Sequence, residues 1–265
     1  MADARRRPRV LMSGRAAAGI CDWTGESTLS GYGGAGNARG LAQGMAGWAA
    51  MAATYDCADE EQRAEGIREA VAAVLRGDLV VLPTDTVYGI GADAFRPSAV
   101  TSLLAAKGRG RDMPPPVLVG TVRAAAALVE DLGLYGQDLI DEFWPGALTL
   151  VCRASRSLHW DLGETRGTVA VRMPDHPVAL DLLGQTGPMA VSSANLSGSP
   201  PATTAAAALD QLGDTAAVYL DAGPSAGDEP STIIDLTGDQ PRLLRLGGIG
   251  VGRLRDVAPV AMQTD

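Results

Sequence analysis

The stretch LVVLPTDTVYGIG occupies residues 79–91 and sets a pattern that the rest of the chain repeats. Its first four residues are apolar and are followed by Pro83, which is typical of a short buried strand that ends at a loop. Thr84, Asp85 and Thr86 come directly after it. Because ligands in open α/β sheets bind beyond strand ends, these side chains suit a small polar ligand. The same residue types also satisfy backbone groups in turns, so this stretch alone leaves both interpretations open.

A helix is predicted directly before this strand. Asp59 can cap it, and Glu60 and Glu61 suit the positive end of its dipole. Apolar residues then recur at helical spacing, and Gly77 is a natural stop. We expect ordered structure to begin near Asp59.

Segments of helix type and strand type alternate after residue 91. The predicted helices are 98–106, 122–129, 136–143, 176–183, 203–212 and 249–257. The predicted strands are 117–119, 148–152, 168–172, 189–192, 218–220, 232–236 and 243–246. Such alternation predicts an α/β (α+β) protein with helices layered around one sheet. Since neither a repeat nor a linker follows residue 58, we expect a single domain over residues 51–265.

Residues 1–50 have a different composition. The segment 30–47 is rich in Gly and Ala and has no apolar period of 2 or 3.6. Such a segment buries too little apolar surface to offset its ordering entropy. We expect a disordered N-terminal extension or an over-extended gene start, with no role in the chemistry of the 51–265 domain.

Charge and composition exclude several classes of protein. The formal net charge is −9, which disfavours general nucleic-acid binding because such binding depends on neutralising phosphates. The three cysteines lie far apart without metal-ligand spacing, which indicates a reducing cytoplasm, and two histidines are too few for a His-based metal site. No apolar run approaches the roughly 20 residues that span a bilayer, so we expect no membrane association.

A second polar segment, KGRGR at residues 107–111, places three cations within five residues. We expect an exposed, flexible loop that binds phosphate, since Arg forks a phosphate while Lys supplies a point charge. A solvated surface loop is the alternative. Lys107 is the only lysine in the chain and Asn195 is the only asparagine after Met51, which favours a functional role for both.

The third segment is SSANLSG at residues 192–198, directly after an apolar run. Its hydroxyl and carboxamide groups can bind a ribose, a phosphate or a carboxylate, or they can simply form a turn. Arg172 and Arg245 each end a further apolar run. Either arginine could be a surface residue with its own ion pair.

Taken together and in order, these segments resemble the YrdC/TsaC family of threonylcarbamoyl-AMP synthases. The matching segments are PTDTVYGIG, KGR, FWPGALTL, VRMPDHP, SSANLSG and STIIDLT, and they span roughly residues 59–249. The resemblance implies a twisted, mixed, open sheet of the YrdC type with flanking helices, in the single-domain form of the family. Gly110 departs from the family pattern, which usually has Pro after the arginine of the KGR segment.

The resemblance also implies roles for individual residues. The implied catalytic residues are Lys107 and Arg109. The implied L-threonine contacts are Thr86, Arg172, Ser193 and Ser231. The implied ATP contacts are Arg109, Thr168, Asn195, Thr203 and Arg245. Mg2+ is expected to arrive with ATP, without a metal site of the protein's own.

The reaction implied by the resemblance forms threonylcarbamoyl-AMP and pyrophosphate from L-threonine, bicarbonate and ATP. The product would pass to a tRNA threonylcarbamoyl transferase complex that modifies the adenosine beside the anticodon. Two alternatives remain open. One is a YciO-like paralogue with another acceptor, and the other is an RNA-binding module of the same fold, although the net charge does not indicate direct tRNA binding.

Overall fold

The computed structural model describes residues 52–262, so the predicted N-terminal extension lies outside the described part of the chain. The strands are β1 (Ala53–Asp56), β2 (Val80–Leu82), β3 (Gly89–Asp93), β4 (Val117–Leu118), β5 (Leu148–Arg153), β6 (Thr168–Arg172), β7 (Met189–Ser193), β8 (Val218–Asp221), β9 (Thr232–Asp235), β10 (Arg242–Arg245) and β11 (Ala261–Met262). The helices are α1 (Glu60–Arg76), α2 (Pro97–Lys107), α3 (Val122–Leu128), α4 (Gly136–Phe143), α5 (Pro177–Thr186), α6 (Ala205–Leu212) and α7 (Val251–Val257), with a 3-10 turn η1 (Gly213–Thr215).

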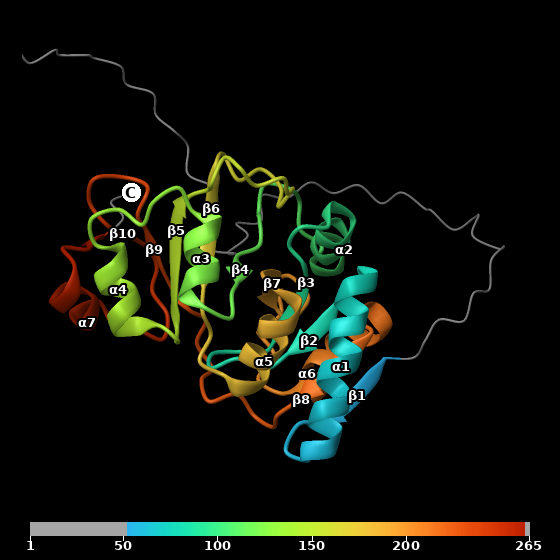
Figure 1. The fold of residues 1–265 in the computed structure, drawn as a ribbon. Helices are drawn as coiled ribbons and strands as arrows, with labels where there is room; N and C mark the ends of the chain where they lie inside the picture. Colours follow the sequence, from blue (N-terminus) through green and yellow to red (C-terminus); the bar gives the residue numbers. More distant parts are fainter. Residues whose placement is uncertain (1–51, 263–265) are drawn as a thin grey trace, which may run out of the picture.

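Within residues 52–262 the strands form one mixed sheet with the order β1-β8-β2-β3-β7-β4-β6-β5-β9-β10-β11. Strands β3, β7 and β4 pair antiparallel, as do β5 with β6, whereas β4 with β6 and β5 with β9 pair parallel. The predicted α/β class and mixed, open sheet are therefore confirmed. This order brings the polar segments that follow β2 and β7 close to the ends of β6 and β5 (Figure 1).

Helix α1 forms as its end signals predict. The Asp59 side chain accepts a hydrogen bond from Gln62 N at 2.8 Å, and Gly77 closes the helix in the left-handed conformation with φ 97°. The expected beginning of order near Asp59 is wrong, because β1 precedes it and pairs parallel with β8.

Strands β3 and β11 were also not predicted. In β3 the reason is glycine, which is disfavoured in strands. Here Gly89 and Gly91 pair with β7, and Val191 and Met189 occupy the space beside them. A Cβ at Gly89 would lie 2.6 Å from Val191 Cγ1, and one at Gly91 would lie 2.9 Å from Met189 Cε. Packing against a neighbouring strand thus overrides the local preference.

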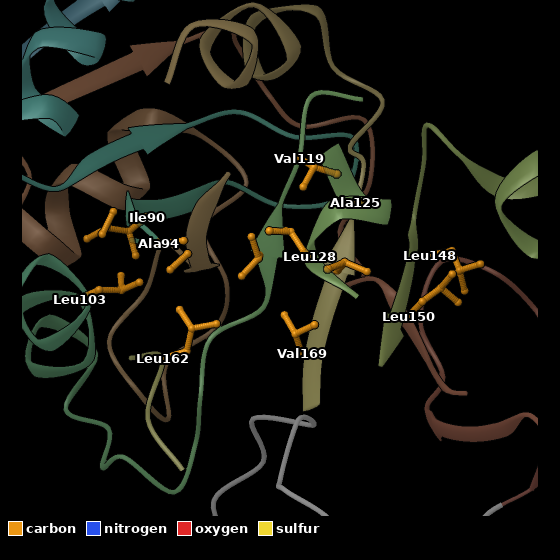
Figure 2. Packing of buried hydrophobic residues seen from close by; sticks show 14 of the residues in the cluster. Ile90, Ala94, Leu103, Val119, Ala125, Leu128, Leu148, Leu150, Leu162 and Val169 are labelled. Atoms are coloured by element: carbon orange, nitrogen blue, oxygen red, sulfur yellow. The ribbon is translucent and has the colours of Figure 1, made fainter. Parts of the chain in front are cut away.

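One face of the sheet packs on α2, α3, α4, α6 and α7 in the main hydrophobic core. Figure 2 shows part of this core, with Leu103 of α2 on the side of Ile90 and Leu128 of α3 nearer to Leu150 and Val169. None of the described helices is long and apolar enough to cross a membrane.

Helices α1 and α5 cover only part of the opposite face. They pack on residues of β2, β4, β7 and β8 in a second core cluster. A third, small cluster contains Val151, Ala170 and Ile233, with the partly buried Leu244 against it. All four of its members come from strands β5, β6, β9 and β10, and none comes from a described helix. Ala170 and Ile233 of this cluster line a cleft.

Two helical glycines should respond oppositely to alanine. A Cβ at Gly66 of α1 would lie 2.6 Å from Tyr55 Cβ on β1, whereas nothing lies within 4 Å of that position at Gly184 of α5. Alanine favours a helix over glycine by about 1 kcal/mol. We therefore expect Gly184→Ala to raise the free energy of unfolding by up to about 1 kcal/mol, and Gly66→Ala to lower it by about 1–3 kcal/mol through overpacking. Urea denaturation of both variants tests this, and a stabilising Gly66→Ala would contradict the close contact of α1 with β1.

Candidate active site

A cleft of about 540 Å³ lies over the open part of the sheet, at the ends of several strands. The residues that line it include Thr84, Thr86, Arg109, Leu118, Thr149, Ala170, Arg172, Val191, Ser192, Ser193, Asn195, Ser231, Ile233 and Arg245. Among the described lining residues, the charged ones are all arginines. The cleft therefore combines a small apolar floor with hydroxyl groups and positive charge, which suits an anionic ligand.

Arg172 ends β6 and is held on three sides. Its Nε donates to Gly146 O at 2.9 Å, its Nη1 to Thr86 Oγ1 at 3.0 Å, and its Nη2 to Asp85 Oδ1 at 2.6 Å. The side chain is 7% exposed. Burial lowers the pKa of Arg172, and the carboxylate of Asp85 opposes that shift. The guanidinium thus keeps a fixed orientation, and two of its five N–H groups remain for a ligand.

Ser231 precedes β9 and is held by its neighbours on β10 and β5. Arg245 donates to Ser231 O from Nε at 3.1 Å and from Nη2 at 2.8 Å. The hydroxyl of Ser231 lies 2.7 Å from that of Thr149. Gly247 allows the close approach of the two segments, since a Cβ there would lie 2.1 Å from Pro230 O.

Lys107 corrects the expectation of an exposed, flexible loop. It is the last residue of α2 and is only 1% exposed. Its ammonium donates to Ser193 O at 2.6 Å, to Asn195 Oδ1 at 3.0 Å, and to Asn195 O. The structure thus joins the two rare residues in one buried unit. All three N–H groups of Lys107 bond to protein oxygens, so Lys107 supports the 193–199 loop from beneath the cleft.

The same unit fixes Asn195. Its Nδ2 donates to Leu196 O at 2.9 Å and to Ser199 O at 2.7 Å.

The pKa of Lys107 is lowered to about 7, mainly by burial and to a smaller extent by the positive charge of Arg109. The three oxygen acceptors favour the charged form, because a neutral amine would set a lone pair against one of them.

Arg109 follows the helix end and faces the cleft. Its Nη1 donates to Ser192 Oγ at 3.2 Å. The loop continues through Arg111, whose Nη2 pairs with Asp161 Oδ1 at 2.8 Å and whose carbonyl accepts from Glu164 N at 2.6 Å. The loop that carries Arg109 is therefore attached to the loop between β5 and β6.

Seven of the residues predicted for the site line the cleft together: Thr86, Arg109, Arg172, Ser193, Asn195, Ser231 and Arg245. Thr168 and Thr203 are not among its lining residues. Thr168 begins β6, about 13 Å along the strand from Arg172 at 3.3 Å per residue. Thr203 lies in the loop before α6, where its carbonyl accepts from Ser225 N at 2.8 Å.

Sequence reasoning gave no individual role to four polar residues of the site: Thr84, Asp85 as the partner of Arg172, Thr149 and Ser192. Thr84, Asp85 and Ser192 stood in segments already singled out, but their partners depend on strand order. Thr149 had a weak signal, as a hydroxyl within an apolar strand. Among residues 52–262, no three His, Cys, Asp or Glu side chains gather as metal ligands.

Comparisons of the sequence and of the structure with known proteins all find members of one family. Residues 72–247 match the profile of the Sua5/YciO/YrdC family, described as "Telomere recombination". A Mycobacterium tuberculosis protein is 58% identical over 210 residues, which are 79% of this chain and 97% of that protein. The Bacillus subtilis threonylcarbamoyl-AMP synthase is 39% identical over 186 residues, 69% of this chain and 54% of its own. The structure of Pyrococcus abyssi Sua5 complexed with L-threonine aligns with a TM-score of 0.73 at 32% identity, over 80% of this chain and 62% of that one.

Removal of the buried ammonium should destabilise the protein. Lys107→Met would leave Asn195 O and Asn195 Oδ1 without their donor, whereas Ser193 O still accepts from Asn195 N. The expected cost is about 1–3 kcal/mol for an unsatisfied buried group. We expect the melting temperature to fall by about 2–12 °C, given about 2–4 °C per kcal/mol at this size. Arg123→Met, which removes an exposed cation from α3, is the control and should melt like the wild type. Unchanged melting of Lys107→Met would contradict a structural role for this ammonium.

Proposed function

Because the chain belongs to the Sua5/YciO/YrdC family, we propose that it is a threonylcarbamoyl-AMP synthase, a nucleotidyltransferase that forms threonylcarbamoyl-AMP and pyrophosphate from L-threonine, bicarbonate and ATP. The single observation that carries this proposal is the cleft of Arg109, Arg172 and Arg245 over the open part of the sheet. A chain with a net charge of −9 gathers positive charge there. All three substrates carry negative groups, so the cleft complements them.

The reaction proceeds in two bond-forming steps. The amine of threonine attacks the carbon of bicarbonate, and loss of water gives a carbamate. A carbamate oxygen then attacks the α-phosphorus of ATP, the bond to the β-phosphate breaks, and pyrophosphate leaves. Alignment and electrostatic stabilisation of the charged oxygens dominate such phosphoryl chemistry.

The held arginines suit these tasks. Arg172, whose orientation is fixed by Thr86, Asp85 and Gly146, binds the carboxylate of threonine. Arg109 and Arg245 bind the phosphates, since guanidinium groups bind phosphate oxygens bidentately. The remaining proposed contacts are Ser193 and Ser231 for threonine, and Thr168, Asn195 and Thr203 for the nucleotide.

Lys107 acts in this proposal by holding the 193–199 loop, because its three N–H groups already bond to Ser193 and Asn195. Magnesium enters as part of the MgATP substrate, held by phosphate oxygens and water. The described residues offer no cluster of carboxylates for it, and no step depends on it here.

The product is a mixed anhydride, which must be consumed by an acyl-transfer reaction. We propose that a tRNA threonylcarbamoyl transferase complex in the cytoplasm receives it, so that this chain serves tRNA processing. The L-threonine complex of the Pyrococcus relative supports threonine as the amino acid.

The direct test is incubation of the protein with MgATP, bicarbonate and one amino acid. Pyrophosphate release and detection of the acyl adenylate by mass spectrometry should both require threonine and bicarbonate. Release of pyrophosphate without bicarbonate would point to another acceptor, as expected of a paralogue with a different reaction.

Amino-acid selectivity should favour threonine over valine. A site that hydrogen-bonds a substrate hydroxyl rejects an analogue without it, because its own polar groups then lose their partner. Thr86, Ser193 and Ser231 are the cleft hydroxyls that we propose for this contact. We expect kcat/KM for valine to be at least about 100-fold lower than for threonine, and serine, which keeps the hydroxyl, to lie between them. Equal turnover of valine would remove the threonine assignment.

A further inference from the structure

Two hydroxyl groups meet at the floor of the cleft, on side chains that are buried yet line it. Thr149 of β5 is 1% exposed and Ser231 is 7% exposed, and their oxygens lie 2.7 Å apart. In the β5–β6 register Leu150 pairs with Val171, so the next step places Thr149 opposite Arg172. In the β5–β9 register Thr149 pairs with Ile233, two residues beyond Ser231. The hydroxyl pair therefore lies between Arg172 on one side and Arg245, which donates to Ser231 O, on the other.

The protons of this pair can be counted. A guanidinium only donates, so Arg245 Nη2, at 3.3 Å from Ser231 Oγ, takes a lone pair of that oxygen. Of the two hydroxyl protons, one lies in the contact between Thr149 and Ser231. The other has no acceptor among the hydrogen bonds of the described residues. Because both residues line the cleft, the pair can offer this one O–H donor to a ligand.

The hydroxyl of Thr86, in contrast, can only accept a hydrogen bond from a ligand. Thr84 Oγ1 donates to Val87 O at 2.6 Å, so it can only accept from Thr86 Oγ1 at 3.0 Å. The proton of Thr86 is thereby used, and Arg172 Nη1 takes one of its lone pairs. Thr86 thus offers the cleft an acceptor only, and the oxygens of a substrate need a donor elsewhere.

We propose that Thr149 is a positioning residue, which orders the hydroxyl of Ser231 so that the pair donates one hydrogen bond to an oxygen of the amino-acid substrate. This deepens the proposed function and rests on it. The flanking guanidiniums of Arg172 and Arg245 make the position favourable for an oxygen that carries negative charge or a lone pair, which in threonine is a carboxylate or the side-chain hydroxyl oxygen.

Thr149→Val tests the proposal, because valine keeps the shape of threonine and removes only the hydroxyl, whose one partner among the described residues is Ser231. With pyrophosphate release as the readout, we expect KM for threonine to rise roughly tenfold, in keeping with the loss of one ordered hydrogen bond. KM for ATP should stay within twofold of wild type. Thr149→Ser, which restores the hydroxyl, should return KM for threonine to within about threefold.

A double-variant cycle shows whether Thr149 acts through Ser231. Thr149→Val added to Ser231→Ala should have no further effect on KM for threonine, since residues that act as a unit are not additive. Fully additive effects, an unchanged KM for threonine in Thr149→Val, or an equal rise of both KM values would each overturn the proposal. A melting curve of every variant, recorded without substrate, identifies loss of fold.

Two analogues identify the oxygen that receives the bond. L-2-Aminobutyrate lacks the hydroxyl and L-threoninol lacks the carboxylate. Calorimetric titration into wild type and Thr149→Val should show the tenfold loss for one analogue and not for the other. A loss that persists for both analogues would overturn the proposal. Wild-type protein that neither binds threonine nor releases pyrophosphate would overturn the proposed function as well, whereas normal wild-type turnover with an unaffected Thr149→Val overturns this inference alone.

Discussion

The site depends on one constraint of packing: α1 and α5 cover the strands from β8 to β4 on their side of the sheet. No described helix covers β6, β5, β9 and β10 there, and polar side chains surround the small apolar cluster of Val151, Ala170 and Ile233. A helix over the whole face would have filled the cleft with apolar residues. Instead, several groups there are buried to less than one-tenth exposure and satisfy one another. Arg172 pairs with Asp85, and Thr149 pairs with Ser231. Since an unpaired buried polar group costs about 1–3 kcal/mol, such pairing allows buried polar groups to line the cleft.

The same pairing preorganises the cations. Each arginine of the cleft is held by an oxygen of the protein: Arg172 by Gly146 O, Arg245 by Ser231 O and Arg109 by Ser192 Oγ. A guanidinium has five N–H groups, so it can be held by some of them and still present others to a ligand. Orientation is then fixed before the substrate binds, and less entropy is lost in the bound state. Rigid cations around a small volume are what a reaction between anions requires.

Local signals in the sequence predicted the elements well and the contacts poorly. Asp59 and Gly77 mark the ends of α1 through their own backbone hydrogen bonds, so their effect is visible in a few neighbouring residues. The sequence did not predict strand β3, because its glycines make room for Val191 and Met189, which lie about 100 residues further along the chain. The segments that begin at Thr84 and Ser192 were found because each follows an apolar run, but the pair of Asp85 with Arg172 joins residues 87 positions apart. No local pattern predicts such a partner, since strand order decides it.

Lys107 shows why a residue type can be informative when its surroundings are misjudged. Of the 22 lysine and arginine residues of this chain, all except Lys107 are arginine. Lysine therefore stands only at this position. At position 107 three oxygens surround one nitrogen: Ser193 O, Asn195 O and Asn195 Oδ1. An ammonium has three N–H groups on a single atom and matches this set, whereas a planar fork of five would leave donors unpaired in a site that is 1% exposed. Lysine fits this position because the space is small and its three acceptors converge on one point. The reason lies in packing beneath the cleft and not in exposure to it.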